Sequence, residues 1–128
     1  MTVDAVAGVL EAVQPQEAGV YPLPGRDWIH LIGPENSAAT GITVGLSIFP
    51  AGSAPPGHVH DTQEEVVFVI SGEGQLVAPT GTVELRAGTC VHVPPGLEHA
   101  TVSRGPEPLR LLCSFAPSVA PGSYEATS

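Results

Sequence analysis

Alternation of apolar and polar residues is the main pattern in the middle of the chain. It is most regular over residues 41–50, where Ile42, Val44, Leu46 and Ile48 alternate with Thr43, Gly45, Ser47 and Phe49. Successive side chains of a strand point to opposite faces. The pattern predicts a strand with one face in the core and the other bordering a cavity. Similar short runs predict strands at 28–32, 66–70, 75–78, 82–86, 89–93, 100–103 and 109–116.

Turn residues separate these runs at short intervals. The chain of 128 residues contains 15 glycines and 14 prolines, which favours many short elements over long helices. Pro22 to Gly25 is expected to form a turn, and Pro79-Thr80-Gly81 is expected to join a hairpin. The spacing predicts one all-β domain over 1–128, a barrel or jelly roll with a core at about 26–116.

The two ends of the chain lack this alternation. Val3, Val6, Leu10 and Val13 recur at spacings of three and four, which fits a short helix that ends before Pro15. The same segment, 1–15, equally fits a loose arm or one that packs against a partner subunit. Residues 117–128 have no periodic apolar pattern and are expected to form a flexible tail.

The charge balance excludes one large class of partner. Thirteen acidic residues against four arginines and no lysine give a formal net charge of −9, the wrong sign for binding a phosphate backbone. The N-terminal residues lack the basic region of a secretory signal, and no run of about 18 apolar residues is present to span a membrane. The expectation is a soluble cytoplasmic protein without nucleic-acid or membrane partners.

The two cysteines do not form a recognised pair motif. Cys90 and Cys113 lie 23 residues apart, a spacing that excludes zinc-ribbon and thioredoxin-like motifs. Each is expected to be a small buried residue with a free thiol.

The stretch from Gly52 to Gly72 carries most of the metal-binding chemistry. His58 and His60 leave the same face of an extended segment, and Glu64 and Glu65 stand at the start of the next predicted strand. His99, after a Pro-Pro-Gly turn, supplies a third imidazole. Imidazole and carboxylate together suit one divalent Fe, Mn, Ni, Zn or Cu ion.

Two further histidines are weaker candidates. His30 lies in the predicted strand 28–32, outside this pattern, and is expected to be a packed or exposed histidine. His92 shares a strand face with Cys90, and it points outward if the ligands lie on the face of Val91 and Val93. Trp28, the only tryptophan, is expected to fill the barrel or a subunit contact.

These residues fall into two motifs that resemble those of the cupin superfamily. The first motif, G-x5-H-x-H-x(3,4)-E-x6-G, is matched by Gly52, His58, His60, Glu65 and Gly72. The second motif, G-x5-P-x-G-x2-H-x3-N, is matched by Gly88, Pro94, Gly96 and His99, with Ser103 in place of the final Asn. Together the motifs cover residues 52–103.

The resemblance implies a double-stranded β-helix with a metal held in its mouth by His58, His60, Glu65 and His99. Glu65 is preferred to Glu64 because it preserves the spacing to Gly72. No separate catalytic acid or base is marked, so metal-bound water or substrate at these four residues is expected to react.

The family has several functions, and the sequence allows them to be ranked but leaves the choice between them open. A dioxygenase acting on a small organic molecule is placed first. A non-redox isomerase, lyase, decarboxylase or polyketide-modifying enzyme is the alternative, and a barrel that binds a sugar or another small molecule without chemistry is the third. Exposed strand edges and the N-terminal arm lead us to expect a homodimer.

Overall fold

The structure, a computed structural model, describes residues 8–124; residues 1–7 and 125–128 lie outside the described part. It is an all-β jelly roll whose only helical element among the described residues is one 3-10 turn. The elements are η1 (Pro15–Glu17), β1 (Gly19–Leu23), β2 (Arg26–Ile32), β3 (Thr43–Phe49), β4 (Glu64–Ser71), β5 (Gly74–Ala78), β6 (Gly81–Leu85), β7 (Cys90–Val93), β8 (Ala100–Ser103) and β9 (Leu109–Ala116).

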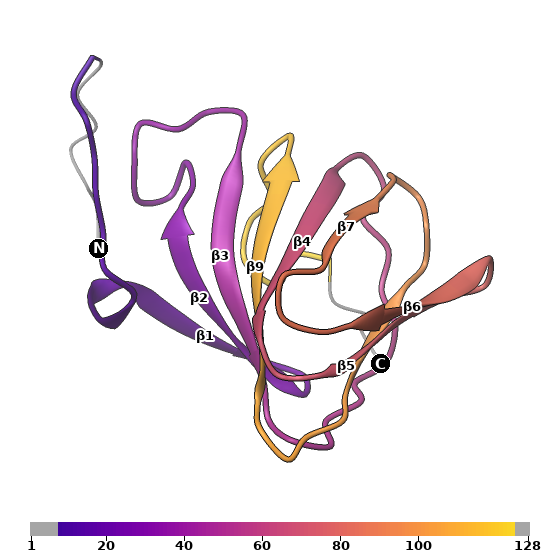
Figure 1. Cartoon of the computed structure of the whole chain (residues 1–128). Coiled ribbons are helices and arrows are strands. Elements are labelled where there is room, and N and C mark those ends of the chain that lie inside the picture. Colours follow the sequence, from indigo (N-terminus) through magenta and orange to yellow (C-terminus); the bar gives the residue numbers. More distant parts are fainter. Residues whose placement is uncertain (1–7, 125–128) are drawn as a thin grey trace.

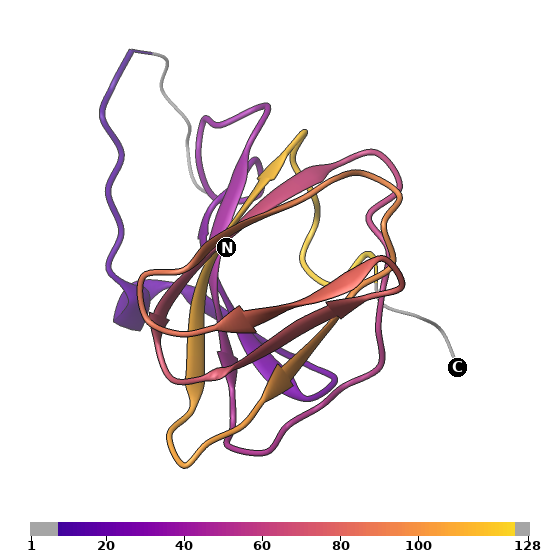
Figure 2. The same ribbon diagram turned by 45° about the vertical axis from the view of Figure 1, so that its right-hand side comes forward.

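The strands form two antiparallel sheets that face each other. The larger sheet has the order β1-β2-β3-β9-β4-β7, and the smaller has the order β6-β5-β8. Figures 1 and 2 show the smaller sheet lying across the concave side of the larger one. No helix of the described residues is long and apolar enough to cross a membrane.

The centre of the larger sheet aligns the residues that face the interior. Ser47 on β3 pairs with Leu111 on β9, and Cys113 on β9 pairs with Val67 on β4. These side chains are all buried, and burial of their apolar surface stabilises the fold. The hydrophobic core consists of Trp28, Phe49, Val67, Val69, Leu76, Leu85, Val93, Leu109, Leu111, Cys113, Phe115 and Val119.

The face of β3 that points into the barrel is not the one that the sequence predicted. The apolar face was expected in the core, but the face with the small and polar residues points inward. Thr43, Ser47 and Phe49 are buried on the inside, whereas Ile42 is 43% exposed. On the outer face, Leu46 is covered by its cross-strand neighbours Ile29 and Leu112. The expectation that the small and polar face borders a cavity holds, but the apolar face packs across the outside of the sheet and does not form the core.

Trp28 fills the interior next to a glycine of the neighbouring strand. The indole is 2% exposed and lies edge-on to Phe115, with ring centroids 6.0 Å apart. A Cβ atom at Gly45 would collide with the indole ring, so only glycine fits this position of β3. The prediction that Trp28 fills the barrel agrees with this position.

The ends of the chain differ from the expectations. Val3 and Val6 lie outside the described residues, and residues 8–14 form no helix; Pro15 begins the 3-10 turn instead of ending a helix. The predicted turn around Pro22 is partly strand, because β1 continues to Leu23. Proline is tolerated there since β1 is the edge of the sheet.

Residues 117–124, which were assigned to a flexible tail, pack on the barrel. The backbone N–H of Val119 donates to Oγ1 of Thr43, whose hydroxyl donates to the Val119 carbonyl oxygen, at 3.0 and 3.1 Å. Val119 is itself buried. The local pattern gives no sign of this packing because the contacts come from a strand about 76 residues earlier.

Both cysteines are free thiols. Cys113 is buried in the interior as expected, but Cys90 is exposed on the outer face of β7. The prediction that Cys90 is buried is therefore wrong. The reason is the alternation of side chains along this short edge strand: Val91 and Val93 point to the less exposed face, and Cys90 points to the other.

Candidate metal centre

A pair of backbone hydrogen bonds brings the two motifs together. The N–H of His58 donates to the His99 carbonyl oxygen at 2.9 Å, and the N–H of His99 donates to the His58 carbonyl oxygen at 3.0 Å. The two residues thus form an antiparallel bridge although they are 41 positions apart. This bridge fixes the segment before β4 against the start of β8.

Three imidazoles converge beside this bridge. One ring nitrogen from each of His58, His60 and His99 lies within 4.8 Å of the other two. His60 and His99 are 2% and 4% exposed. The structure therefore joins the histidines that the sequence proposed as ligands, although two come from one motif and the third from the other.

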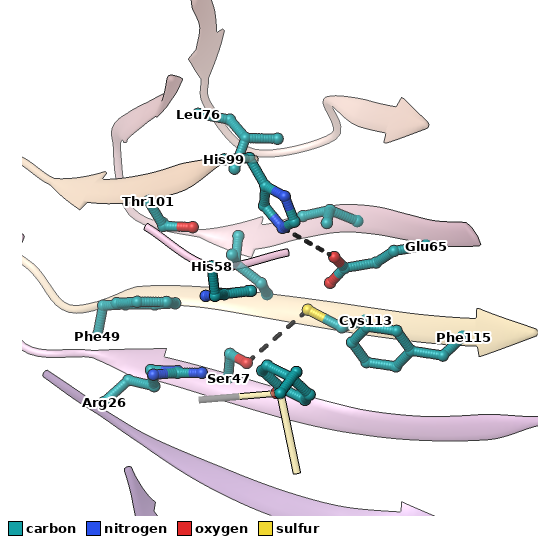
Figure 3. A pocket seen from close by; sticks show the side chains of 13 residues that line it. Arg26, Ser47, Phe49, His58, Glu65, Leu76, His99, Thr101, Cys113 and Phe115 are labelled. Carbon is teal, nitrogen blue, oxygen red and sulfur yellow. Dashed lines mark hydrogen bonds and ion pairs between the residues drawn. The ribbon is translucent and has the colours of Figure 1, made fainter. Parts of the chain in front are cut away.

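Glu65, at the start of β4, completes the group. Its Oε1 lies 3.4 Å from Nε2 of His60 and 3.3 Å from Nε2 of His99. Figure 3 shows the Glu65 carboxylate directed at the His99 ring from the opposite wall. The register of β4 accounts for this position, because Glu65 shares the inward face with Val67 and Val69.

A backbone contact sets the orientation of His99. Its Nδ1 lies 2.9 Å from the carbonyl oxygen of Leu97. A carbonyl oxygen can only accept, so Nδ1 carries the proton and Nε2 of the neutral ring keeps its lone pair on the side of Glu65. Such an outer contact is typical of histidines that bind metals through the other nitrogen.

Burial and mutual proximity shift the pKa values of the group. Burial alone would raise the pKa of Glu65, but contacts with His60 and His99 outweigh it and lower that pKa to about 2. Burial, followed by the charges of His99 and His60, lowers the pKa of His58 to about 3. Burial opposes protonation of His99 too, but Glu65 and the Leu97 carbonyl raise its pKa. Glu65 is thus ionised and His58 neutral at pH 7, the forms that bind metals.

Several polar atoms of the group have no hydrogen-bond partner among the described residues. They are buried nitrogens and oxygens that normally find a partner in a folded protein. The atoms are Nδ1 of His58, both ring nitrogens of His60 and Oε1 of Glu65. Lone pairs that converge in this way cannot form hydrogen bonds with one another, whereas a divalent cation can be bound by all of them at once. The residues present therefore fit one metal ion.

The cavity beside these residues is small and mainly apolar. Its volume is about 20 Å³, room for about one water molecule. Its walls come from both sheets, and Figure 3 shows the side chains of Arg26, His58 and Glu65 around one space. The remaining lining residues are Ser47, Phe49, Val67, Leu76, His99, Thr101, Leu111, Cys113, Phe115 and Tyr124.

Tyr124 covers the histidines from the C-terminal segment. Its ring centroid lies 4.3 Å from that of His60 and 4.9 Å from that of His58. Burial raises the pKa of its hydroxyl, which is therefore neutral. The hydrogen bonds between Thr43 and Val119 hold this segment in place.

The other candidate residues lie away from the group. Glu64 is 58% exposed and its carboxylate lies 2.8 Å from Nε2 of His92 on the outer face. His30 is buried and accepts a hydrogen bond at Nδ1 from the indole N–H of Trp28 at 3.0 Å. Its Nε2 then donates to Glu35 at 2.9 Å. His92 and His30 thus have partners of their own.

Sequence reasoning did not identify Arg26, Tyr124 and Cys113 as cavity residues. A strand beginning at Arg26 instead of Trp28 would have placed Arg26 on the inward face with Trp28, since the two are separated by one residue. Cys113 follows the alternation of β9 with Leu111. Tyr124 carries no local signal.

Comparison with known proteins agrees with the fold and the motifs. The family model described as "Cupin domain" matches residues 45–115. The dimethylsulfoniopropionate lyase DddW of Ruegeria pomeroyi is 33% identical over 113 residues, which cover 88% of this chain and 70% of that protein. An uncharacterised protein of Methanocaldococcus jannaschii is 32% identical over 81 residues, 63% of this chain and 62% of that protein.

Solved structures show the same fold at lower identity. The polyketide cyclase RemF from Streptomyces resistomycificus has a TM-score of 0.74 at 21% identity, over 88% of this chain and 83% of that chain. The dimethylsulfoniopropionate lyase DddQ from Ruegeria pomeroyi has a TM-score of 0.71 at 22% identity, over 80% and 57% of the two chains. Since the family model matches more than half of the residues and both motifs meet at one site, the chain belongs to the cupin family.

Proposed function

We propose that this protein is a metal-dependent enzyme that carries out non-redox, lyase-type chemistry on a small molecule. The observation that carries the proposal is the convergence of His58, His60 and His99 with Glu65 beside a cavity. Several of their polar atoms have no hydrogen-bond partner within residues 8–124. A structural metal site has every position filled by protein. Here the group borders a small cavity instead.

The four side chains would hold one divalent metal. When bound, such an ion supplies Lewis acidity that polarises a carbonyl or carboxylate oxygen of a substrate. Glu65 reduces the net charge of the site and, through its contacts with His60 and His99, keeps both rings facing the same point. In the neutral ring of His99 the Leu97 carbonyl holds the proton on Nδ1, so Nε2 faces that point with its lone pair.

The walls restrict what can enter. Val67, Leu76 and Leu111 give the cavity an apolar side, which lowers the local dielectric and strengthens electrostatic interactions. Tyr124 lies over His58 and His60 and limits access of bulk water. The site thus suits stabilisation of negative charge that develops on a substrate oxygen, which both eliminations and isomerisations of carbonyl compounds need.

Similarity to named enzymes supports the non-redox alternative over the dioxygenase that sequence analysis placed first. The Ruegeria relative, 33% identical, is named as a lyase. The fold neighbours described above are a cyclase and a second lyase, although at that identity they support the fold alone. The metal group itself does not separate the two chemistries, because the same donors bind redox-active and redox-inert ions.

The proposal is tested by turnover with and without dioxygen. Purified protein is loaded separately with Zn²⁺, Mn²⁺ and Fe²⁺ and supplied with a panel of small acids and carbonyl compounds. The panel begins with dimethylsulfoniopropionate, for which the Ruegeria relative is named. We expect product at equal rates in air and in an anaerobic chamber. A reaction that consumes dioxygen would contradict the proposal and support the dioxygenase that sequence analysis placed first.

A further inference from the structure

A second cavity, which we call the side pocket, lies between the β5–β6 hairpin and strand β7. Its volume is about 240 Å³, compared with about 20 Å³ for the cavity beside the metal-binding group. Strands β6 and β7 are end strands of the two sheets, so they do not pair with each other. The side pocket therefore occupies a place where the barrel is left open between two strand edges.

The side chains that face the side pocket are apolar. Leu76 of β5 is buried and pairs with Val83 of β6, so cross-strand neighbours place both side chains on the inner face of the smaller sheet. On β7, Val91 and Val93 take the less exposed, inward positions. The apolar residues of the lining are Leu76, Ala78, Val83, Val91, Val93 and Leu97.

The walls of the side pocket offer no partner for an ion. Among the described residues that line it there is no Asp, Glu, Lys or Arg. His92 belongs to the lining, but its ring contacts Glu64 on the outer face at 2.8 Å. A charged ligand would lose hydration in the side pocket without gaining a compensating partner, which is costly. The lining therefore selects against charged molecules.

The side pocket also leaves apolar surface exposed next to the core. Val83 is 41% exposed, and Val91 and Leu97 pack on the core while they stay partly exposed. Covering such surface with an apolar ligand is favourable because it removes the surface from water. A cavity of about 150 Å³ lined by apolar side chains can bind benzene. The larger side pocket thus has room for a six-membered ring with a short substituent.

Two residues connect the side pocket to the metal-binding group. Leu76 and His99 line both the side pocket and the small cavity, and Figure 3 shows them close together. Leu97, in another wall, supplies the carbonyl oxygen that lies 2.9 Å from Nδ1 of His99. A molecule in the side pocket would thus pack against the residues that position one of the three histidines.

We propose that the side pocket binds a small uncharged molecule whose apolar body is the size of a six-membered ring. The body packs on Val83, Val91 and Leu97, and a hydrogen-bonding group on the molecule meets the backbone edges of β6 and β7 at the rim. The proposal is independent of the reaction and of the metal ion, because it rests on the size of the side pocket and on its uncharged walls.

The test is a titration of the ¹⁵N-labelled, Zn²⁺-loaded full chain with benzyl alcohol, followed by NMR. We expect saturable shifts of the amide resonances of Ala78, Val83, Val91 and Leu97, with a Kd of about 1 mM. Amides of β1, which also exposes apolar side chains, should not shift. Benzoate, similar in shape but charged, should bind the side pocket at least about 10-fold more weakly.

Two substitutions that narrow the side pocket should weaken this binding. V83F enlarges a side chain on the inner face of β6, and A78L does so on β5; each should weaken binding of benzyl alcohol by about 10-fold or more through steric overlap. V66F is the matched control, because Val66 is 40% exposed on the outer face of β4. It should bind benzyl alcohol as wild type does.

Wild-type affinity in folded V83F and A78L, equal affinity for benzoate, or shifts centred on β1 would overturn the proposal. Shifts of the side-pocket amides that depend on protein concentration without benzyl alcohol would identify a second copy of the chain as the occupant, which also overturns it. The titration needs no turnover, so failure to find lyase activity would refute the proposed function while leaving this result intact.

Discussion

Oε1 of Glu65 lies 3.3 Å from Nε2 of His99, although the two residues are 34 positions apart in the chain. The neighbouring Glu64 points the other way and contacts His92 on the outer surface. Alternation along β4 thus separates two adjacent acids into a site residue and a surface residue.

This separation predicts different effects of matched substitutions. E65Q removes a charged oxygen beside His60 and His99 and should weaken Zn²⁺ binding by about 10-fold or more. E64Q changes an exposed carboxylate and should leave the affinity within about twofold. Competition with a chromophoric chelator measures both constants. Equal weakening in the two variants would show that Glu65 has no special part in holding the ion.

The Tyr124 ring, 4.3 Å from that of His60, predicts a barrier to exchange of the ion. Y124A should release bound Zn²⁺ to excess EDTA several-fold faster than wild type, because the C-terminal segment then no longer covers the histidines. Y21A, on the partly exposed edge strand β1, is the matched control. Release by Y124A at the wild-type rate would mean that ions leave by another route.

The pKa shifts predict how stability of the metal-free protein depends on pH. Folding lowers the pKa of His58 from 6.5 to about 3 and that of Glu65 from 4.5 to about 2. The unfolded chain therefore binds more protons below pH 6.5, and stability falls as the pH is lowered from about 6.5 toward 2. His99, whose pKa is raised, contributes in the opposite sense and loses its contribution above pH 6.5.

Thermal melting of the metal-free protein across pH 3 to 8 measures this dependence. In H58Q the decrease between pH 6.5 and 3 should be shallower than in wild type, while the part that Glu65 contributes below pH 4.5 should remain. Identical curves for the two proteins would rule out His58 as a source of the acid sensitivity.

The outer face of β4 supports the expectation of a homodimer, which remains a prediction. Val66, Phe68 and Ile70 are 40–44% exposed in a row, and proteins commonly cover apolar surface of this kind. Light scattering should give twice the 13.1 kDa chain mass at micromolar concentration, and F68D should shift it toward the monomer. A wild-type monomer would count against the expectation.

The sequence predicted most strands and the metal-binding group because both depend on local spacing. Strand alternation is a property of neighbouring residues, and the two motifs contain the ligands with the turns that aim them. Strand β1 was missed because its residues are mostly exposed and include Pro22, so it lacks alternation. The inward face of β3 was misassigned because the cavity side carries small and polar residues while the outer side carries Leu46 and its neighbours.

The positions of Arg26 and Tyr124 in the cavity could not be predicted from local sequence, for a different reason. Whether Arg26 opens a strand or closes a turn depends on its pairing with Leu23 across the β1–β2 hairpin. The place of Tyr124 depends on the anchoring of Val119 by Thr43, a contact between distant parts of the chain. Neither relationship leaves a periodic pattern.

The central claim, that His58, His60 and His99 together hold one metal ion, is tested most directly by metal stoichiometry. Wild type and H99A are dialysed against the same buffered Zn²⁺ and analysed by inductively coupled plasma mass spectrometry, with H92A as the control for an exposed histidine. Circular dichroism checks that each variant is folded. We predict one ion per chain in wild type and H92A and little or none in H99A. Full occupancy in folded H99A would contradict the account.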